Sequence, residues 1–280
     1  MRLYRTTQGL ARESGGLLQL LDLPHADVAE LFAADVTLAS TAAVRDESDI
    51  DSASLLSPVR RPANFILNGL LYAGHIAEAG REPTRDPVFT LCNGGDLDPP
   101  GETILLPAGA SDQVDYEGEI ALVVGQRAKN VSRHAAWACV GGLTIINDVS
   151  ERREQHEGMA SDPWDTAAMV RSKRHPTFKP CGPLVVTADE FDGVPDLEIQ
   201  TRLNGIRVQH DWSRNMIFDF AEIVSYISQT VELAPGDVIS TGTPAGVAIS
   251  TGRYLQDRDV IEVQVERLGV LRNNVALGTS

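Results

Sequence analysis

Short apolar runs separated by Gly, Pro, Asn and Asp recur along the chain and predict a fold built mainly from β-strands. The clearest run is 120–124, which is unbroken and ends at Gly125. Apolar and polar residues alternate over 197–203 and 260–265, which predicts two more strands. Asn204-Gly205 directly follows the first of these and is a strong signal for a two-residue hairpin turn.

Helical periodicity is confined to short segments. The longest is 218–228, where Phe220, Ile223 and Ile227 recur at helical spacing. Shorter helices are predicted at about 26–33 and 133–139. The other segments with a prediction are strands at 65–67, 141–147, 184–186 and 238–240, turns with a hairpin-like approach over 81–114, and a loop over 158–170.

A polar stretch near residue 50 predicts a domain boundary. Residues 1–23 alternate short apolar segments with turns, as a small β-meander does. Residues 45–57 are polar, and Pro58 and Pro62 follow them. We therefore expect a small N-terminal α+β domain over 1–60 and a catalytic domain over 61–280, because every candidate for chemistry lies after the boundary.

Composition excludes several classes of protein. The 280 residues are 42% hydrophobic and 22% charged, as in ordinary globular proteins. The chain has 24 basic and 39 acidic residues, a net charge of −15, which argues against nucleic acid or anionic membrane as a partner. No segment is long and apolar enough to span a bilayer, and residues 1–20 lack a signal-peptide layout. Cys92, Cys139 and Cys181 form no C-x-x-C pair, which fits a reducing cytoplasm.

Two carboxylates flank the start of the clearest strand. Glu117 and Glu119 point to the same face, because side chains alternate along a strand, and Gly118 between them has no side chain. A solvated edge strand would carry both charges easily. A buried strand would need a counter-charge, which a divalent cation with oxygen ligands would supply. Asp148 ends the strand at 141–147, either as a cap or turn residue or as a third carboxylate for that cation.

Three other segments carry candidate chemistry. His75 and Glu78 lie three residues apart in a helical turn, either as a surface ion pair or as an imidazole oriented by a carboxylate for general-base catalysis. Lys173 lies in a cationic cluster at 171–179, which is either a solvated surface or a site for an anionic ligand. The glycine-rich loop 241–246 could bind a carboxylate or phosphate through its N–H groups, but it matches neither the P-loop nor G-x-G-x-x-G.

Taken together, residues 58–280 resemble the fumarylacetoacetate hydrolase family, with a motif layout like that of its acylpyruvate hydrolase and 2-hydroxyhepta-2,4-diene-1,7-dioate isomerase members. Several separated motifs occur in family order. They are the E-x-E strand at 115–119, the N-D-V-S-x-R segment at 147–152, the T-G-T-P-x-G loop at 241–246, and a segment at 69–78 similar to the G-x-N-Y-x-x-H-x-x-E lid.

The resemblance implies a fold and a set of roles. The fold would be α+β and mainly β, with a mixed β-sandwich or roll as catalytic domain. Family members are commonly homodimers. The implied roles are metal ligands at Glu117, Glu119 and Asp148, a catalytic set of His75, Glu78 and Lys173, and substrate contacts at Tyr72, Arg152, Gln155 and Thr243.

Three residues depart from the family pattern. Leu71 replaces the usual Asn of the lid, Cys92 precedes Asn93 where many members have Lys-Pro, and Pro176 takes the place of a common Asp. These positions lie around the substrate rather than among the metal ligands. They therefore bear on substrate identity more than on metal binding.

The predicted reaction follows from the oxygen-only ligand set, which favours Mg²⁺, Mn²⁺ or Ca²⁺ over zinc, with Mg²⁺ chosen for its availability. Such an ion stabilises the enolate of a 2-oxo acid. We expect hydrolysis of a C–C bond in a 2,4-dioxo acid, of the acylpyruvate type or a diketo-deoxy sugar acid, to give pyruvate and a carboxylic acid. The alternatives are an isomerase or decarboxylase of 2-oxo or 2-hydroxydienoic diacids in aromatic catabolism, and a non-enzymatic metal- or ligand-binding protein.

Overall fold

Two packed β-sheets form the body of the molecule in a computed structural model, which describes residues 1–108, 112–161 and 165–278. The larger sheet has the strand order β4-β3-β2-β1-β13-β11-β10-β16-β6-β7, and β5 pairs with β1. Its strands are β1 Arg2–Thr6, β2 Gly9–Ser14, β3 Leu17–Leu21, β4 Val44–Asp49, β5 Leu55–Leu56, β6 Phe65–Gly69, β7 Val88–Leu91, β10 Gly118–Val124, β11 Val140–Asn147, β13 Cys181–Thr187 and β16 Val238–Ser240.

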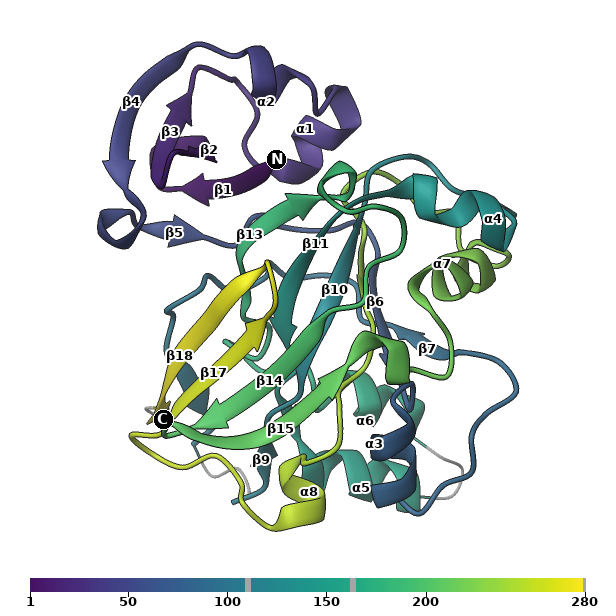
Figure 1. Ribbon diagram of the computed structural model, residues 1–280. Coiled ribbons are helices and arrows are strands. Elements are labelled where there is room, and N and C mark those ends of the chain that lie inside the picture. Colours follow the sequence, from purple (N-terminus) through teal and green to yellow (C-terminus); the bar gives the residue numbers. More distant parts are fainter. Residues whose placement is uncertain (109–111, 162–164, 279–280) are drawn as a thin grey trace.

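The smaller sheet packs against the middle of the larger one (Figure 1). Its order is β15-β14-β17-β18-β8. The strands are β8 Ile104–Leu106, β14 Glu198–Leu203, β15 Ile206–Trp212, β17 Val260–Val265 and β18 Gly269–Leu277, and a separate pair joins β9 Val114–Asp115 to β12 Ser150–Glu151. The prediction of an α+β, mainly β fold is therefore confirmed.

Helices are short and lie outside the sheets (Figure 1). None of those in the described residues has the length and apolarity needed to cross a membrane. They are α1 Val28–Ala34, α2 Leu38–Thr41, α3 Ala73–Glu78, α4 Arg133–Ala136, α5 Arg152–Ala160, α6 Thr166–Arg171, α7 Phe220–Ser228 and α8 Ala248–Thr251, with 3-10 turns at Ile50–Ser52, Trp137–Cys139, Ala188–Glu190 and Ser213–Asn215.

Strand β10 is the centre of the fold and is buried along its whole length. Ile120 and Leu122 belong to the core between the sheets, together with Val263 of the facing sheet. Ala121 and Val123 belong to a second core on the other face. Because side chains alternate, Glu117 and Glu119 share the face of Ala121 and point away from the smaller sheet.

The Asn204-Gly205 hairpin is confirmed. These two residues alone separate β14 from β15, and both have positive φ, 53° and 79°. Positive φ at both central residues is what a type I′ turn requires, and Asn-Gly adopts it at low cost. The turn sets the register of the outer hairpin of the smaller sheet.

The predicted loop over 158–170 is wrong within the described residues. Helix α5 continues to Ala160, and α6 begins at Thr166 with Asp165 as its N-cap, while 162–164 lie outside the described residues. The Asp165 carboxylate accepts hydrogen bonds from the N–H groups of Ala167 and Ala168. Asp is a common N-cap residue, so this capping was readable from the sequence.

The first strands extend the large sheet rather than form a sheet of their own. β1 pairs with β13 at Leu3 opposite Val185, and β2, β3 and β4 continue outward from it. Figure 1 shows these strands and α1 together at one end of the molecule. The domain boundary at residue 60 stays a prediction. Of the turns predicted over 81–114, residues 109–111 lie outside the described residues.

We predict that Gly118→Ala destabilises the fold because β10 approaches the smaller sheet most closely at this glycine. A Cβ at 118 would overlap the Thr201 hydroxyl and lie 2.9 Å from Cγ1 of Val263. Overpacking of this kind costs about 1–3 kcal/mol of unfolding free energy, which urea unfolding measures. Gly69→Ala in β6 is the matched control, since nothing lies within 4 Å of a Cβ there. Equal losses in both variants would contradict the prediction.

Candidate metal centre and active site

The register of β10 and β11 brings three carboxylates together. Gly118 pairs with Asn147, so Glu117 and Asp148 meet where the two strands end. The Asp148 N–H donates to the Glu117 carbonyl at 2.8 Å, and the Glu117 N–H donates to Oδ1 of Asn147 at 3.0 Å. One oxygen from each of Glu117, Glu119 and Asp148 lies within 4.8 Å of the others, and all three residues are buried. Asp148 is therefore not a helix cap, because α5 begins later with Glu151 as its N-cap.

Burial and mutual repulsion push the pKa values of these carboxylates apart. The pKa of Glu119 is raised well above its ordinary value, first by burial and then by the charges of Asp148 and Glu117. Burial alone would raise the pKa of Glu117, but Arg152 and Lys173 outweigh it and lower that pKa. One carboxylate of the group thus retains a proton where another remains ionised.

Arg152, the first residue of α5, is held by two carboxylates at once. Its Nε donates to Asp115 at 2.8 Å, and its other nitrogens donate to Oε1 of Glu117 and, at 2.9 Å, to Gln155. Asp115 is fully buried and also accepts from the N–H groups of Ala248 at 2.7 Å and Ile249 at 3.0 Å. Asp115 therefore fixes Arg152 against the carboxylate group.

Asp115 is a residue of this centre to which the sequence assigned no role. The available signal was its spacing, because residues 115, 117 and 119 share one face of an extended segment. Arg152 and Gln155, predicted as substrate contacts, are adjacent and bonded to each other. Their contact with substrate stays a prediction.

Two lysines contact the carboxylate group. Nζ of Lys173 donates to Oε2 of Glu117 at 2.9 Å and to Oδ2 of Asp148. Nζ of Lys179 donates to Oδ1 of the same aspartate. The pKa of Lys173 is raised: burial opposes this, but Asp148 and Glu117 outweigh it. The sequence analysis assigned no role to Lys179, which was one member of the cationic cluster at 171–179.

Helix α3 brings the His75–Glu78 pair to the same centre. Nδ1 of His75 lies 2.7 Å from Oε1 of Glu78, and the other Glu78 oxygen accepts from the Gly246 N–H at 2.9 Å. His75 is close enough to Glu117 to contribute to lowering its pKa. The glycine-rich loop thus positions the dyad, and a carboxylate on Nδ1 leaves Nε2 as the free ring nitrogen.

The hydroxyl groups of Tyr72 and Thr243 differ in their hydrogen bonds. Tyr72 is fully buried, and its hydroxyl has no hydrogen-bond partner in the described part of the chain. Burial, then Asp211 and Glu119, raise the pKa of Tyr72. The Thr243 hydroxyl donates to the Gly118 carbonyl at 3.0 Å and accepts from Gln209 at 2.8 Å. The Thr243 hydroxyl therefore bonds to β10, whereas the hydroxyl of Tyr72 is left unpaired among the described residues.

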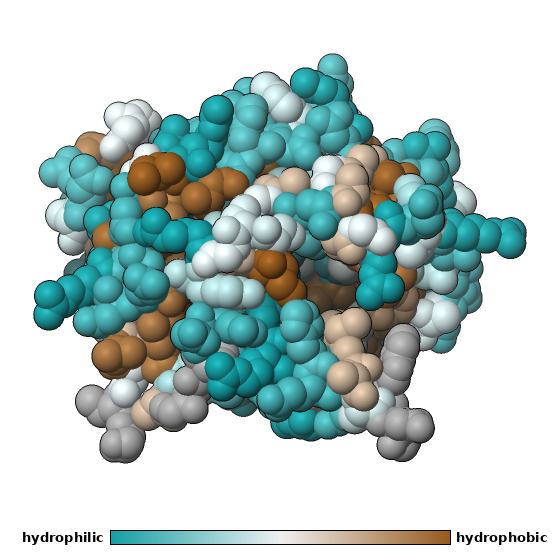
Figure 2. Space-filling view, turned by 90° about the horizontal axis from the view of Figure 1, so that it is seen from below, coloured by the Kyte–Doolittle hydropathy of each residue, from teal (hydrophilic) through white to brown (hydrophobic). Residues whose placement is uncertain are grey.

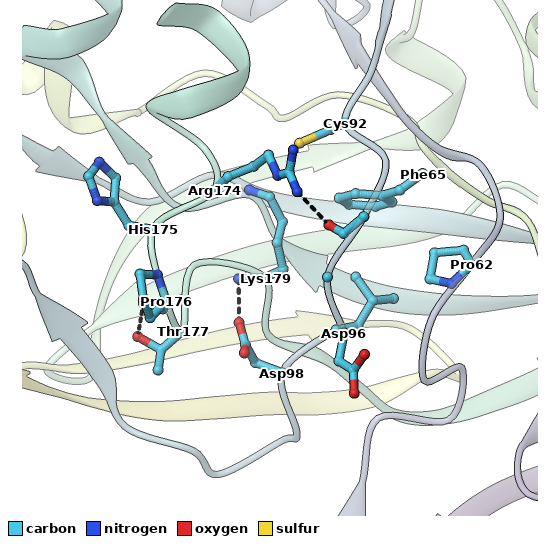
Figure 3. Close-up of a pocket in the computed structure, with 13 residues that line it drawn as sticks. Pro62, Phe65, Cys92, Asp96, Asp98, Arg174, His175, Pro176, Thr177 and Lys179 are labelled. Carbon is cyan, nitrogen blue, oxygen red and sulfur yellow. Dashed lines mark hydrogen bonds between the residues drawn. The ribbon is translucent and has the colours of Figure 1, made fainter.

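The three departures from the family pattern lie near this centre. Leu71 is fully buried, Cys92 is buried, and Pro176 is exposed. Burial raises the pKa of the Cys92 thiol. Cys92 and Pro176 line a cavity of about 190 Å³ together with Lys179, Arg174 and Asp98 (Figure 3). Figure 2 shows the end of the molecule nearest α3 and α5 (Figure 1), where hydrophobic residues lie at the bottom of a recess with hydrophilic residues around it.

Comparison with known proteins adds a family and three kinds of relative. Residues 64–276 match the family described as Fumarylacetoacetate (FAA) hydrolase C-terminal. The chain is 34% identical over 222 residues to the 2,4-didehydro-3-deoxy-L-rhamnonate hydrolase of Sphingomonas sp. (strain SKA58), covering 78% of this chain and 75% of that one. It is also 34% identical over 224 residues to a mitochondrial oxaloacetate tautomerase of Bos taurus, covering 79% and 69%.

One solved structure is similar to this chain over its whole length. The 2-hydroxyhepta-2,4-diene-1,7-dioate isomerase from Mycobacterium marinum superposes with a TM-score of 0.77 at 31% identity, and the match covers 100% of both chains. The relatives are thus a hydrolase, a tautomerase and an isomerase.

We predict that Mg²⁺ stabilises the protein more strongly as the pH rises. Because the pKa of Glu119 in the folded state lies above its ordinary value of 4.5, the folded state retains a proton that the unfolded chain releases. That contribution to stability is present at low pH and is lost as the pH rises through the folded pKa. A divalent cation bound there would replace the proton, so the increase in Tm caused by MgCl₂ should grow as the pH rises above the ordinary value of 4.5.

Thermal unfolding with MgCl₂ or with KCl at equal ionic strength measures this effect. In Glu119→Gln the dependence on pH should largely disappear, because the titrating ligand is gone. A Tm increase that is constant or falls with pH in the unmodified protein would contradict the prediction.

Proposed function

We propose that this chain, which belongs to the fumarylacetoacetate hydrolase family, is a divalent-cation-dependent hydrolase of 2,4-dioxo acids. The product pair would be pyruvate and a carboxylic acid, from an acylpyruvate-type substrate or a diketo-deoxy sugar acid. The observation that carries the proposal is the group of buried carboxylates Glu117, Glu119 and Asp148 beside the His75–Glu78 pair.

The donor set fits a hard divalent cation. All three candidate ligands are carboxylates, and no His or Cys joins them among the described residues. Oxygen ligands suit Mg²⁺, with Mn²⁺ or Ca²⁺ as alternatives, and do not suit zinc. The raised pKa of Glu119 is further support, because burial and then the charges of Asp148 and Glu117 raise it, and a bound cation would offset both. When bound, such an ion would polarise the 2-oxo group and stabilise enolate charge.

His75 has the arrangement of a general base. Glu78 accepts from Nδ1, so Nε2 can take a proton from a water molecule that attacks the distal carbonyl of the substrate. The C–C bond then breaks, the carboxylic acid is released from the attacked carbon, and the enolate of pyruvate takes a proton at carbon. Gly246 holds the far oxygen of Glu78 and keeps the pair oriented.

Lys173 and Tyr72 supply donors for charge on the substrate. Lys173 is cationic and lies beside two of the carboxylates, so its ammonium can stabilise an oxyanion near the centre. Such a donor contributes about 3–4 kcal/mol to lowering a barrier. The unpaired hydroxyl of Tyr72 can donate to a substrate oxygen. Substrate contacts at Arg152, Gln155 and Thr243 complete the proposal.

A second candidate is an isomerase or tautomerase of 2-oxo or 2-hydroxydienoic diacids. The full-length likeness to an isomerase and the identity to an oxaloacetate tautomerase favour it. A decarboxylase belongs to the same alternative, because all of these reactions pass through an enolate of a 2-oxo acid. A homodimer and a cytoplasmic location stay predictions.

A panel of 2,4-dioxo acids, oxaloacetate and a 2-hydroxydienoic diacid tests the proposal. We expect pyruvate release from at least one 2,4-dioxo acid with MgCl₂ and loss of that activity after EDTA. Product analysis by NMR separates cleavage from isomerisation. Conversion of the diacid alone, without cleavage of any member of the panel, would replace the proposal by the second candidate.

The dyad has its own test. We predict that His75→Ala and Glu78→Ala each lower kcat for C–C cleavage by about 10²–10⁴, the usual contribution of a general base. His210→Ala is the matched control, because His210 pairs with Glu198 at 2.7 Å on an exposed strand of the smaller sheet. Full turnover in both dyad variants would show that His75 is not the base.

A further inference from the structure

The oxygens of the three candidate ligands divide into two sets. One oxygen of each carboxylate is held by a fixed donor: Oε1 of Glu117 by Arg152, Oε2 of Glu119 by Ser240 and the Gly242 N–H, and Oδ1 of Asp148 by Lys179. Of the other set, Oε2 of Glu117 and Oδ2 of Asp148 both contact Lys173. Each carboxylate therefore has one fixed oxygen and one that a cation can use.

Lys179 is the fixed donor for Asp148, because main-chain contacts hold it in place. Its ammonium also donates to the carbonyls of Phe178 at 3.1 Å and Val149 at 3.5 Å. The main-chain N–H of Lys179 donates to the Asp98 carboxylate at 2.7 Å (Figure 3). The main-chain carbonyl of Lys179 accepts from the Asp98 N–H at 2.8 Å. Only 7% of Lys179 is exposed.

Lys173 touches the same aspartate but is held differently. Within the described part of the chain its ammonium donates to Glu117 and Asp148 and to no main-chain carbonyl. A lysine with only these partners can exchange them for a substrate. Lys179 cannot leave without unpairing two carbonyls and a buried carboxylate oxygen.

The number of free oxygens decides which cation a carboxylate site prefers. Ca²⁺ takes six to eight oxygen ligands and often uses both oxygens of one carboxylate. Mg²⁺ is smaller, takes a near-octahedral set of six and keeps several waters. Three carboxylates that each offer one oxygen suit the smaller ion. Releasing the second oxygen of one of them would suit the larger ion better.

We propose that Lys179 is a positioning residue that limits Asp148 to one cation-binding oxygen and thereby makes the centre select Mg²⁺ over Ca²⁺. The proposal rests on the cation site of the proposed function but not on the reaction carried out there. Lys179 acts through Asp148, to which its ammonium donates.

Binding of Mg²⁺ and of Ca²⁺ to the chelator-treated full chain, each measured by calorimetry without substrate, tests this role. In Lys179→Met the ratio of the Ca²⁺ Kd to the Mg²⁺ Kd should fall about tenfold, because Asp148 gains a second oxygen for Ca²⁺. Lys173→Met is the matched control, since it removes the same charge from the same carboxylate. Loss of charge strengthens the binding of both ions alike, so its ratio should change by less than about twofold.

An unchanged ratio in Lys179→Met, or an equal fall in Lys173→Met, would overturn the proposal. Failure of the unmodified protein to bind either ion would overturn the proposed function together with it. Mg²⁺ binding with a ratio insensitive to Lys179 would overturn the inference alone.

A structure of the unmodified protein with Mn²⁺ or Ca²⁺ decides the proposal even if Lys179→Met does not fold. We expect Oδ1 of Asp148 to stay on Lys179, with Oδ2 alone on the ion. An Asp148 that binds the ion through both oxygens would overturn the proposal.

Discussion

The burial of like charges is the constraint on which the centre depends. Asp115, Glu117, Glu119 and Asp148 are all buried, and Arg152, Lys173 and Lys179 are buried against them. Four carboxylates against three cations leave one negative charge without a partner. In a medium of low polarity that charge must be neutralised by a proton or by a bound cation. The raised pKa of Glu119 corresponds to neutralisation by a proton. A divalent cation would be the other way to neutralise the charge.

The packing of β10 against the smaller sheet makes this burial possible. Glu117 and Glu119 share one face because side chains alternate along the strand, and Gly118 between them turns a bare backbone toward Thr201 and Val263 of the facing sheet. Gln209 and Thr243 then bond the N–H and the carbonyl of Gly118. These bonds hold the strand through main-chain groups that lie between its two carboxylates.

Much of this arrangement was readable from the sequence, because local rules decide it. The apolar run of β10 and the Asn204-Gly205 turn follow from strand and turn chemistry alone. Three separated motifs located the carboxylates and the dyad, although the roles of these residues are still predictions. The predicted loop over 158–170 was wrong because α5 continues to Ala160 and Asp165 caps α6. Asp115 and Lys179 were left without roles, because their partners come from residues 133 and 31 positions away.

The relatives differ in the reaction that their names give, and two parts of the site bear on this difference: the buried carboxylate centre and helix α3. Hydrolysis, tautomerisation and isomerisation of 2-oxo acids all pass through an enolate, and a cation held by the carboxylate centre would stabilise that enolate in each. Under the proposed function, the reactions would differ in the atom that gives its proton to His75: a water oxygen in hydrolysis, a substrate carbon in the other two. His75 lies on α3, outside both sheets, and Glu78 of that helix is bonded to the Gly246 N–H. The base that the proposal uses therefore lies outside the sheets that hold the buried charges.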